Sequence, residues 1–281
     1  MVLLMTMPDI VKGDGTREVF EVRKLEASLA RSGAPHEVVR RVANTIGGGV
    51  RDGMTTSDIY RRAHALLAKE ERTFAAKYSV RRALLDMGPT GFPFEDYFCE
   101  LMRAKGYTAS VRQIVPGRCT RHEVDVVLAR NDEHIGCELK FHNVPGFKTD
   151  LKTALYVRAR FTDIEDRARD EGRTCDINEG WLVTNTKFTA QAIEYAECAG
   201  IRLLGWSHPG RGNLADIIEE TGLYPITVLT TISKKEEALL LRSQVTLCRD
   251  VAKNPDVLLR AGIPKRKHAA IISESTSLCG A

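Results

Sequence analysis

The most constraining feature of this sequence is an alternation of hydrophobic and polar residues over positions 121–143. A β-strand points successive side chains to opposite faces, so this alternation predicts a half-buried hairpin with a polar turn at residues 130–133. Asp125 falls on the polar side of the first strand, and Glu138 and Lys140 fall on the polar side of the second. We therefore expect these three side chains to project close together from the sheet.

Two carboxylates and an ammonium group on one face can bind a hard divalent cation and position a water molecule. Asp125 and Glu138 supply oxygen ligands, and the backbone carbonyl of Leu139 is placed to add a third. Mg²⁺, or Mn²⁺, suits a site with few carboxylates and retained waters. Lys140 would orient the attacking water or stabilise the transition state. The alternative, which the spacing alone leaves open, is an ordinary solvated outer face of a hairpin.

Composition restricts the class of protein. The 281 residues suffice for about two domains of roughly 100–200 residues each. The net charge of +4 means that any affinity for nucleic acid must come from local basic patches. No apolar run approaches the roughly 20 residues that span a bilayer, so no membrane partner is expected. Seven scattered cysteines without a C-x-x-C pair favour reduced thiols in the cytoplasm over disulfides or a zinc site.

The N-terminal 90 residues have their own pattern. Two short extended runs flank Asp14 and Gly15, which predicts a β-hairpin. Helical periodicity follows, with an N-cap region expected at residues 56–58. Two glycines and two prolines at residues 88–93 indicate a short hinge to the next unit.

Ordered motifs in this region, V-K-x-D-G, E-x-x-K-L, T-x-x-D-I and A-x-K-Y-S-V-R-R, resemble the ATP-cone, a regulatory domain of ribonucleotide reductases and a related repressor. The resemblance covers residues 9–88 and implies a β-hairpin lid over a helical bundle that binds ATP or dATP. It further implies that Lys12 and Lys24 contact phosphates and that Glu18 contacts the nucleotide near the hairpin. Thr56 and Tyr60 would line the base or ribose side.

The sequence departs from the family at one position. Gly13 stands where an arginine or lysine usually follows the first lysine, and Arg17 is the nearest cation that could replace it. Taken singly, Lys12 and Lys24 are also compatible with ordinary solvated surface charges.

The spacing Asp-x12-Glu-x-Lys is the pattern of PD-(D/E)xK nucleases, and residues 91–207 resemble their Mrr-like restriction endonuclease branch. The segment G-F-P-F-E before the predicted sheet is similar to the family's G-x-x-F-E, which implies that Glu95 joins the metal site. The alternative role for Glu95 is compensation of charge at a helix N-terminus. The order helix, three strands, helix, strand, helix, strand predicts a mixed sheet flanked by helices.

The expected fold is therefore α/β, or α+β overall, in three parts. Residues 1–90 form an ATP-cone-like domain, residues 91–207 the nuclease-like domain, and residues 208–281 a mainly helical extension of uncertain role. The cations of the helix after the hairpin and the basic cluster at residues 265–268 would contact phosphates without sequence preference. The segment around Gly262 resembles helix-hairpin-helix DNA binding, with a solvated basic loop as the alternative.

These observations predict a Mg²⁺- or Mn²⁺-dependent DNA endonuclease of the cytoplasm, acting on double-stranded DNA and modulated in activity or assembly by ATP or dATP. A homo-oligomer is compatible with this prediction. Two alternatives stay open: a non-catalytic, nucleotide-sensing DNA-binding protein that keeps the nuclease fold as a scaffold, and a nuclease that acts on RNA or branched DNA.

Overall fold

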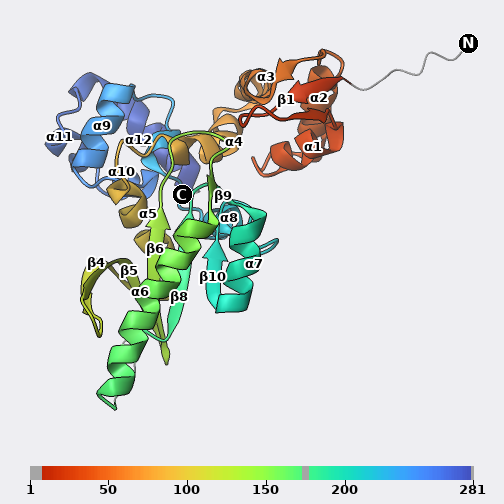
Figure 1. Ribbon diagram of the computed structural model, residues 1–281. Coiled ribbons are helices and arrows are strands. Elements are labelled where there is room, and N and C mark those ends of the chain that lie inside the picture. The colour runs from red at the N-terminus through yellow and green to blue at the C-terminus, as the bar shows by residue number, and fades with distance from the viewer. Residues whose placement is uncertain (1–7, 173–176, 280–281) are drawn as a thin grey trace, which may run out of the picture.

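The computed structural model describes residues 8–172 and 177–279. Figure 1 shows three regions in chain order: an N-terminal region of small strands and helices, a central sheet, and a helical C-terminal region. The expected mixed α/β fold is confirmed. Within the described residues, no helix is both long and apolar enough to cross a membrane.

The N-terminal region, residues 8–87, opens with the predicted hairpin. Strands β1 (Asp9–Val11) and β2 (Arg17–Val19) pair antiparallel, and β3 (Met54–Thr55) joins β1 in parallel. The hydrophobic faces of the following helices enclose a core of their own. These helices are α1 (Val22–Ala30), α2 (His36–Gly47), α3 (Thr56–Glu70) and α4 (Arg72–Leu85).

The N-cap of α3 lies one residue earlier than predicted. Thr55, not Thr56, accepts a hydrogen bond from the backbone N–H of Asp58, and the Asp58 carboxylate accepts one from the backbone N–H of Thr55. This reciprocal capping box satisfies two N–H groups at the helix start. Thr55 and Thr56 are equally suited by residue type to be the N-cap. Thr55 takes this position because it ends the strand that pairs with Val11, so the helix begins directly after it.

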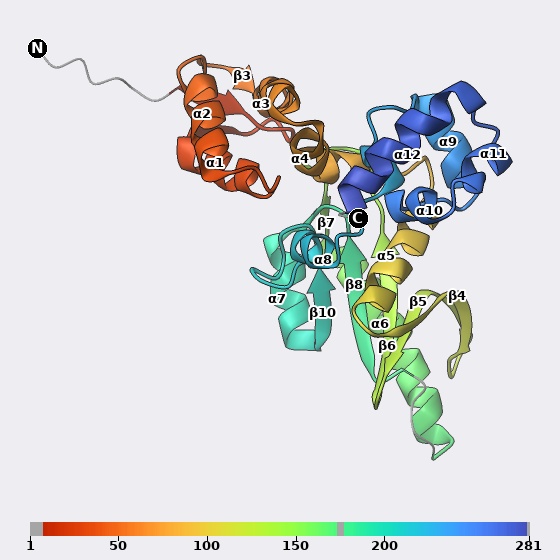
Figure 2. The ribbon, with the colours of Figure 1, turned by 180° about the vertical axis from the view of Figure 1, so that it is seen from behind.

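The central region is a five-stranded mixed sheet in the order β10-β8-β6-β5-β4. Figure 1 shows α6 and α7 against one face, and Figure 2 shows α5 and α8 on the other. Two hydrophobic cores lie on the two sides of this sheet. Its elements are α5 (Phe92–Ala104), β4 (Thr108–Pro116), β5 (Arg121–Arg130), β6 (Glu133–Lys140), α6 (Leu151–Asp170), β8 (Glu179–Thr184), α7 (Ala190–Ala199), β10 (Ile201–Leu204) and α8 (Leu214–Thr221).

The predicted hairpin is present, and β5 alternates between buried and partly exposed residues as expected, but β6 is not half-buried. Residues 135–139 of β6 are all buried, and Glu138 is only 3% exposed. β6 lies between antiparallel β5 and parallel β8, with helices over both faces. A strand in that position is excluded from water on both sides. The alternative of an ordinary solvated outer face is therefore excluded for β6.

A pair of glycines lets α6 approach this sheet closely. Gly136 of β6 and Gly180 of β8 are register partners, and a Cβ on either would overlap the ring of Phe161. The ring thus lies directly on the sheet backbone. This docking fixes α6 over the polar side chains of β5 and β6.

The N-terminal region joins the rest through packing. The C-terminal half of α4 shares the largest core with the sheet and the C-terminal helices, and Met87, just before the predicted hinge, is fully buried. The side chain of Asn185 donates to the carbonyl of Leu84 at 3.3 Å and to that of His142 at 2.7 Å. Two short parallel strands, β7 (Lys148–Thr149) and β9 (Lys187–Phe188), lie beside this junction.

The C-terminal helices differ from the prediction in two places. The sequence over residues 234–250 predicts one helical stretch, but the structure breaks it into two helices, because Gln244 adopts a left-handed conformation with φ 59°. The basic cluster at residues 265–268 is the first turn of a long helix and not a loop. The elements are η1 (Ile226–Val228), α9 (Lys234–Arg242), α10 (Cys248–Lys253), α11 (Asp256–Arg260) and α12 (Lys265–Cys279).

The two helix pairs of this region turn in the same way. The N–H of Val245 bonds to the carbonyl of Leu240, and the N–H of Ile263 bonds to the carbonyl of Leu258. The residues before Val245 and Ile263 both have positive φ. Helices α9 and α11 thus end in the same kind of left-handed turn.

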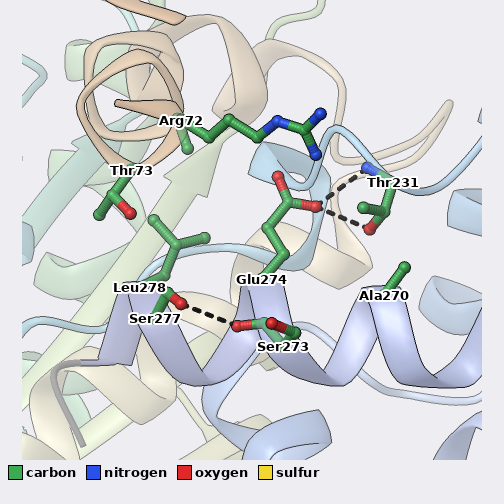
Figure 3. Close-up of a pocket in the computed structure, with 9 residues that line it drawn as sticks. Arg72, Thr73, Thr231, Ala270, Ser273, Glu274, Ser277 and Leu278 are labelled. Carbon is green, nitrogen blue, oxygen red and sulfur yellow. Dashed lines mark hydrogen bonds between the residues drawn. The ribbon is translucent and has the colours of Figure 1, made fainter. Parts of the chain in front are cut away.

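A pocket of about 220 Å³ lies between α4 and α12 (Figure 3). Both oxygens of Glu274 are held by the backbone N–H and hydroxyl groups of Thr230 and Thr231. Arg72 of α4 points toward this carboxylate in Figure 3. None of the residues predicted to act in catalysis or nucleotide binding lines this pocket.

Candidate active site

The structure brings Asp125, Glu138 and Lys140 together on the sheet face that α6 covers. The backbone N–H of Leu139 donates to Asp125 Oδ2 at 2.7 Å. Lys140 Nζ contacts Glu138 Oε1, and the Lys140 side chain is 33% exposed. Lys140 thus reaches the solvent from a site whose carboxylates lie deeper.

Arg160 of α6 completes this cluster, and the sequence did not single it out. Its guanidinium contacts Glu138 Oε2 and donates to the carbonyl of Glu123 at 2.9 Å. Sequence analysis placed it among the phosphate-binding cations of this helix. Because Phe161 lies on the glycine pair, the adjacent Arg160 is carried over Glu138.

Tyr156 lies one turn earlier on α6 and faces the same cations. Its ring centroid is 4.8 Å from the Arg160 guanidinium and 5.9 Å from Lys140 Nζ. The face of an aromatic ring attracts a cation, so Tyr156 helps to hold both groups. Tyr156 is half exposed and forms part of the accessible surface of the site.

The two carboxylates have different electrostatic environments. Burial, followed by the charge of Glu138, raises the pKa of Asp125 to about 6. Glu138 is more deeply buried, but each of its oxygens contacts a cation. Asp125 has no such cation in direct contact among the described residues. Its negative charge is therefore the less compensated of the two.

Glu95 lies at the edge of this cluster. It is 8% exposed, and burial raises its pKa, with the charge of Asp125 contributing in the same direction. Arg112 pairs with Glu95 at 3.0 Å and with Asp96 at 2.7 Å. Arg112 has a left-handed backbone with φ 51°, at a break in the pairing of β4 with β5 opposite Asp125. Such a conformation is costly for a non-glycine residue, and strained residues of this kind gather at functional sites. The sequence around Arg112 does not indicate this left-handed conformation.

The donor set is compatible with a hard divalent cation. Asp125 and Glu138 offer carboxylate oxygens. Burial, followed by the charge of Glu138, raises the pKa of Asp125, and a bound cation would oppose this shift by favouring the ionised carboxylate. In the described part of the chain, no three acidic, histidine or cysteine side chains are already arranged around one point. A Mg²⁺ ion that keeps several waters needs only one or two carboxylates.

Three of the predicted nucleotide-binding residues meet beside the N-terminal hairpin. Glu18 pairs with Lys12 at 2.6 Å and with Lys24 at 3.5 Å. The hydrogen bond from Lys12 lowers the pKa of Glu18. Thr56 follows Thr55, which is paired with Val11 and so lies beside Lys12. Arg17, the expected substitute cation, lies 3.9 Å from Asp52.

Tyr60 lies deeper in the N-terminal region. Its ring stacks on Tyr78 with centroids 5.3 Å apart, and the guanidinium of Arg82 lies 5.4 Å from its centroid. Burial raises the pKa of Tyr60. The structure thus gives Tyr60 an aromatic partner and a cation.

The basic cluster at the start of α12 divides into two pairs. Lys267 contacts Glu236 at 2.6 Å, and His268 contacts the carbonyl of Ile263 at 2.8 Å. Those two side chains support the fold. Lys265 and Arg266 are exposed.

Comparison with known proteins identifies three successive family matches. An ATP cone domain matches residues 8–87, a restriction endonuclease domain of the Mrr type matches residues 87–207, and an AF1548-like C-terminal domain matches residues 224–279. An uncharacterized protein of Archaeoglobus fulgidus is 38% identical over 181 residues, covering 64% of this chain and 98% of that protein. A crystal structure of AF1548, a protein of unknown function, is similar with a TM-score of 0.57 and 35% identity, covering 68% of this chain and 99% of that one.

Proposed function

We propose that this chain, which belongs to the AF1548-like family and carries an ATP cone domain ahead of its Mrr-type restriction endonuclease domain, is a metal-dependent DNA endonuclease regulated by ATP or dATP. The observation that carries the proposal is the meeting of Asp125, Glu138 and Lys140 on one face of the sheet.

Asp125 and Glu138 would hold Mg²⁺ or Mn²⁺, with Glu95 nearby. A bound divalent cation neutralises charge on the phosphate oxygens and lowers the pKa of a bound water. Arg160 supports this by offsetting part of the charge of buried Glu138. Arg112, which pairs with Glu95 and Asp96, would hold Glu95 at the edge of that cation site.

The reaction is hydrolysis of a phosphodiester. Water adds to phosphorus, one P–O ester bond breaks, and the leaving oxygen takes up a proton. Lys140, the most accessible of the three groups, orients the water and stabilises the added negative charge. The exposed cations Lys265 and Arg266 are suited to sequence-independent phosphate contacts on double-stranded DNA.

The N-terminal domain would bind the regulatory nucleotide through Lys12, Lys24 and Glu18 of the hairpin region, with Thr56 and Tyr60 on the base or ribose side. Occupancy would change activity or assembly, including formation of a homo-oligomer. We place the protein in the cytoplasm and its domain boundaries near residues 90 and 207.

The test is cleavage of supercoiled plasmid DNA with Mg²⁺. We expect the wild type to nick or linearise the plasmid and Lys140→Ala to lose at least about 10²-fold in rate, as expected when a group that assists proton transfer is removed. Lys253→Ala, which removes an exposed lysine of α10, is the matched control and should cut like the wild type. Equal rates for wild type and Lys140→Ala would contradict the proposed role of Lys140.

A second candidate is a non-catalytic, nucleotide-sensing DNA-binding protein. The hydrophobic core that α4 shares with the sheet and the C-terminal helices would connect nucleotide binding with DNA binding in such a protein as well. Calorimetric titration with Mg²⁺ separates the two. A nuclease should bind the ion and lose that binding in Asp125→Asn, whereas a scaffold has no reason to bind it. RNA and branched DNA are substrates to include in the cleavage assay.

A further inference from the structure

The turn of the N-terminal hairpin touches the segment that follows the catalytic strand. A Cβ on Gly13 would lie 3.5 Å from the Cβ of Pro145. A Cβ on Gly146 would lie 3.0 Å from the backbone nitrogen of Asp14. Lys148 Nζ lies 3.9 Å from Asp14 Oδ2. The ATP cone domain and the endonuclease domain are thus in contact only a few residues after Lys140.

Cations from both domains gather at this contact. Lys148 and Lys187 are register partners in β7 and β9. Neighbouring strands lie about 4.8 Å apart, so the two lysines start side by side. The guanidinium of Arg81 in α4 lies 6.0 Å from the ring centroid of Trp206, whose backbone N–H bonds to the carbonyl of Thr186 beside Lys187. Lys12 follows β1 and leads into the hairpin turn that meets residues 145–148. Desolvation, followed by the charges of Arg81, Lys12 and Lys148, lowers the pKa of Lys187. The four residues form one group, the junction cations.

Little negative charge balances the junction cations. Lys12 is paired with Glu18, and Lys148 has Asp14 at the edge of ion-pair distance. Within residues 8–172 and 177–279, no carboxylate lies within ion-pair distance of Arg81 or Lys187. Both side chains are accessible to solvent. Close like charges repel, so a polyanion bound here would gain from all of them.

We propose that Lys148 and Lys187 of the endonuclease domain complete, together with Lys12 and Arg81, a binding site for the phosphate chain of a nucleoside triphosphate. The inference rests on the proposed nucleotide binding by the ATP cone domain and adds endonuclease residues to that site. A nucleotide is favoured over DNA because Lys12 lies on the hairpin, beside the start of α3, where the nucleotide is expected.

Such a site gives the nucleotide a direct path to catalysis. Lys148 ends the segment that begins after Lys140, and His142 within it is held by Asn185, whose amide also bonds to Leu84 of the ATP cone domain. A phosphate chain held by Lys148 and Lys187 would fix the end of this segment that lies nearest the hairpin, while Asn185 holds His142 near its other end. Removal of the phosphate would free the end nearest the hairpin.

The test is calorimetric titration of the full-length protein with ATP, ADP and AMP. Lys187→Ala and Lys148→Ala should each weaken ATP binding by roughly ten- to a hundredfold, the effect of one charge-assisted hydrogen bond. AMP, which has no phosphate chain to reach the endonuclease domain, should bind both variants like the wild type. Lys152→Ala is the control, since this lysine lies four residues from Lys148 outside the junction.

The outcomes separate this inference from the proposed function. If ATP binds the wild type, Lys187→Ala and Lys148→Ala equally, the shared site is wrong and nucleotide binding by the ATP cone domain stands. If the wild type binds none of the three nucleotides, both fail. If the two variants lose only affinity for DNA in a filter-binding assay, the junction cations bind nucleic acid and the inference is overturned. Unchanged circular dichroism and Mg²⁺-dependent cleavage without nucleotide show that the variants are folded.

Discussion

At the residue scale, the candidate active site contains two acids whose charges are balanced by different means. Glu138 is almost fully buried and contacts Lys140 and Arg160. Asp125 receives one backbone N–H and keeps a pKa raised to about 6. A bound cation would therefore be drawn to Asp125, the acid whose charge the protein leaves less balanced.

This difference predicts a pH dependence of metal binding. Because the folded pKa of Asp125 lies above its usual 3.8, protonated Asp125 stabilises the metal-free fold, and this contribution is lost as pH rises through about 6. Metal requires the ionised acid. Mn²⁺ should therefore bind more tightly at pH 7 than at pH 5 and should release protons at pH 5 to 6. Calorimetry in buffers of different ionisation enthalpy measures both effects. Equal affinity at the two pH values would show that Asp125 is not a ligand.

Arg160 predicts a stability effect. Arg160→Met leaves buried Glu138 with Lys140 as its one remaining cation, and a lost charge-assisted hydrogen bond should lower the free energy of unfolding by about 1–3 kcal/mol. Arg158→Met is the control on the same helix, because its pair with Glu165 is more exposed and such pairs contribute about 0–1 kcal/mol. Urea denaturation measures both. The account of Arg160 fails if the two variants lose the same free energy.

The residue pattern of the site could be predicted only in part. Asp125, Glu138, Lys140 and Glu95 are brought near one another, although their roles stay predictions. Arg160 was read as a surface cation, because helical periodicity does not reveal how closely a helix docks. The contact of Arg112 with Glu95 could not be predicted, since it depends on a local break in the pairing of β4 with β5.

At the element scale, the contact between α6 and the sheet sets the geometry of the site. Gly136 and Gly180 leave room for the ring of Phe161, so α6 lies close enough for its cations to reach Glu138. A larger side chain at either glycine would push α6 away. The distance between α6 and the sheet therefore depends on the absence of a side chain at Gly136 and Gly180.

This contact predicts the effect of a single methyl group. Gly136→Ala should lower the free energy of unfolding by about 1–3 kcal/mol, because the added Cβ overlaps the Phe161 ring in a closely packed core. Gly210→Ala is the matched control, since no heavy atom lies within 4 Å of its added Cβ, and its effect should stay within about 0.5 kcal/mol. Thermal and urea denaturation measure the difference. An unchanged Gly136→Ala protein would show that α6 is not held by this contact.

The elements themselves were largely predictable where periodicity is strong. The two hairpins, α5, α6 and β8 lie where alternation and helical spacing put them. The break between α9 and α10 was missed because it contains neither glycine nor proline, and Gln244 is a residue without a turn signal. The start of α12 was missed because Pro264 beside a basic run also fits a loop, although proline is common at helix starts. The burial of β6 depends on layers from distant parts of the chain.

At the scale of the whole molecule, α4 connects the three regions. One side of it contributes to the core of the ATP cone domain, and the other shares the largest core with the sheet and α12. The hairpin turn at Asp14 and the amide of Asn185 add contacts to the segment after Lys140. A change in the ATP cone domain thus has two physical routes to the catalytic face.

The most direct test of this account is the initial rate of Mg²⁺-dependent plasmid cleavage at increasing ATP concentration. The account predicts that the wild-type rate changes with ATP, that Lys12→Ala and Lys187→Ala cut but respond only at higher ATP, and that Lys140→Ala does not cut at any concentration. Wild-type cleavage at the same rate with ATP, with dATP and without nucleotide would contradict the coupling of the two domains.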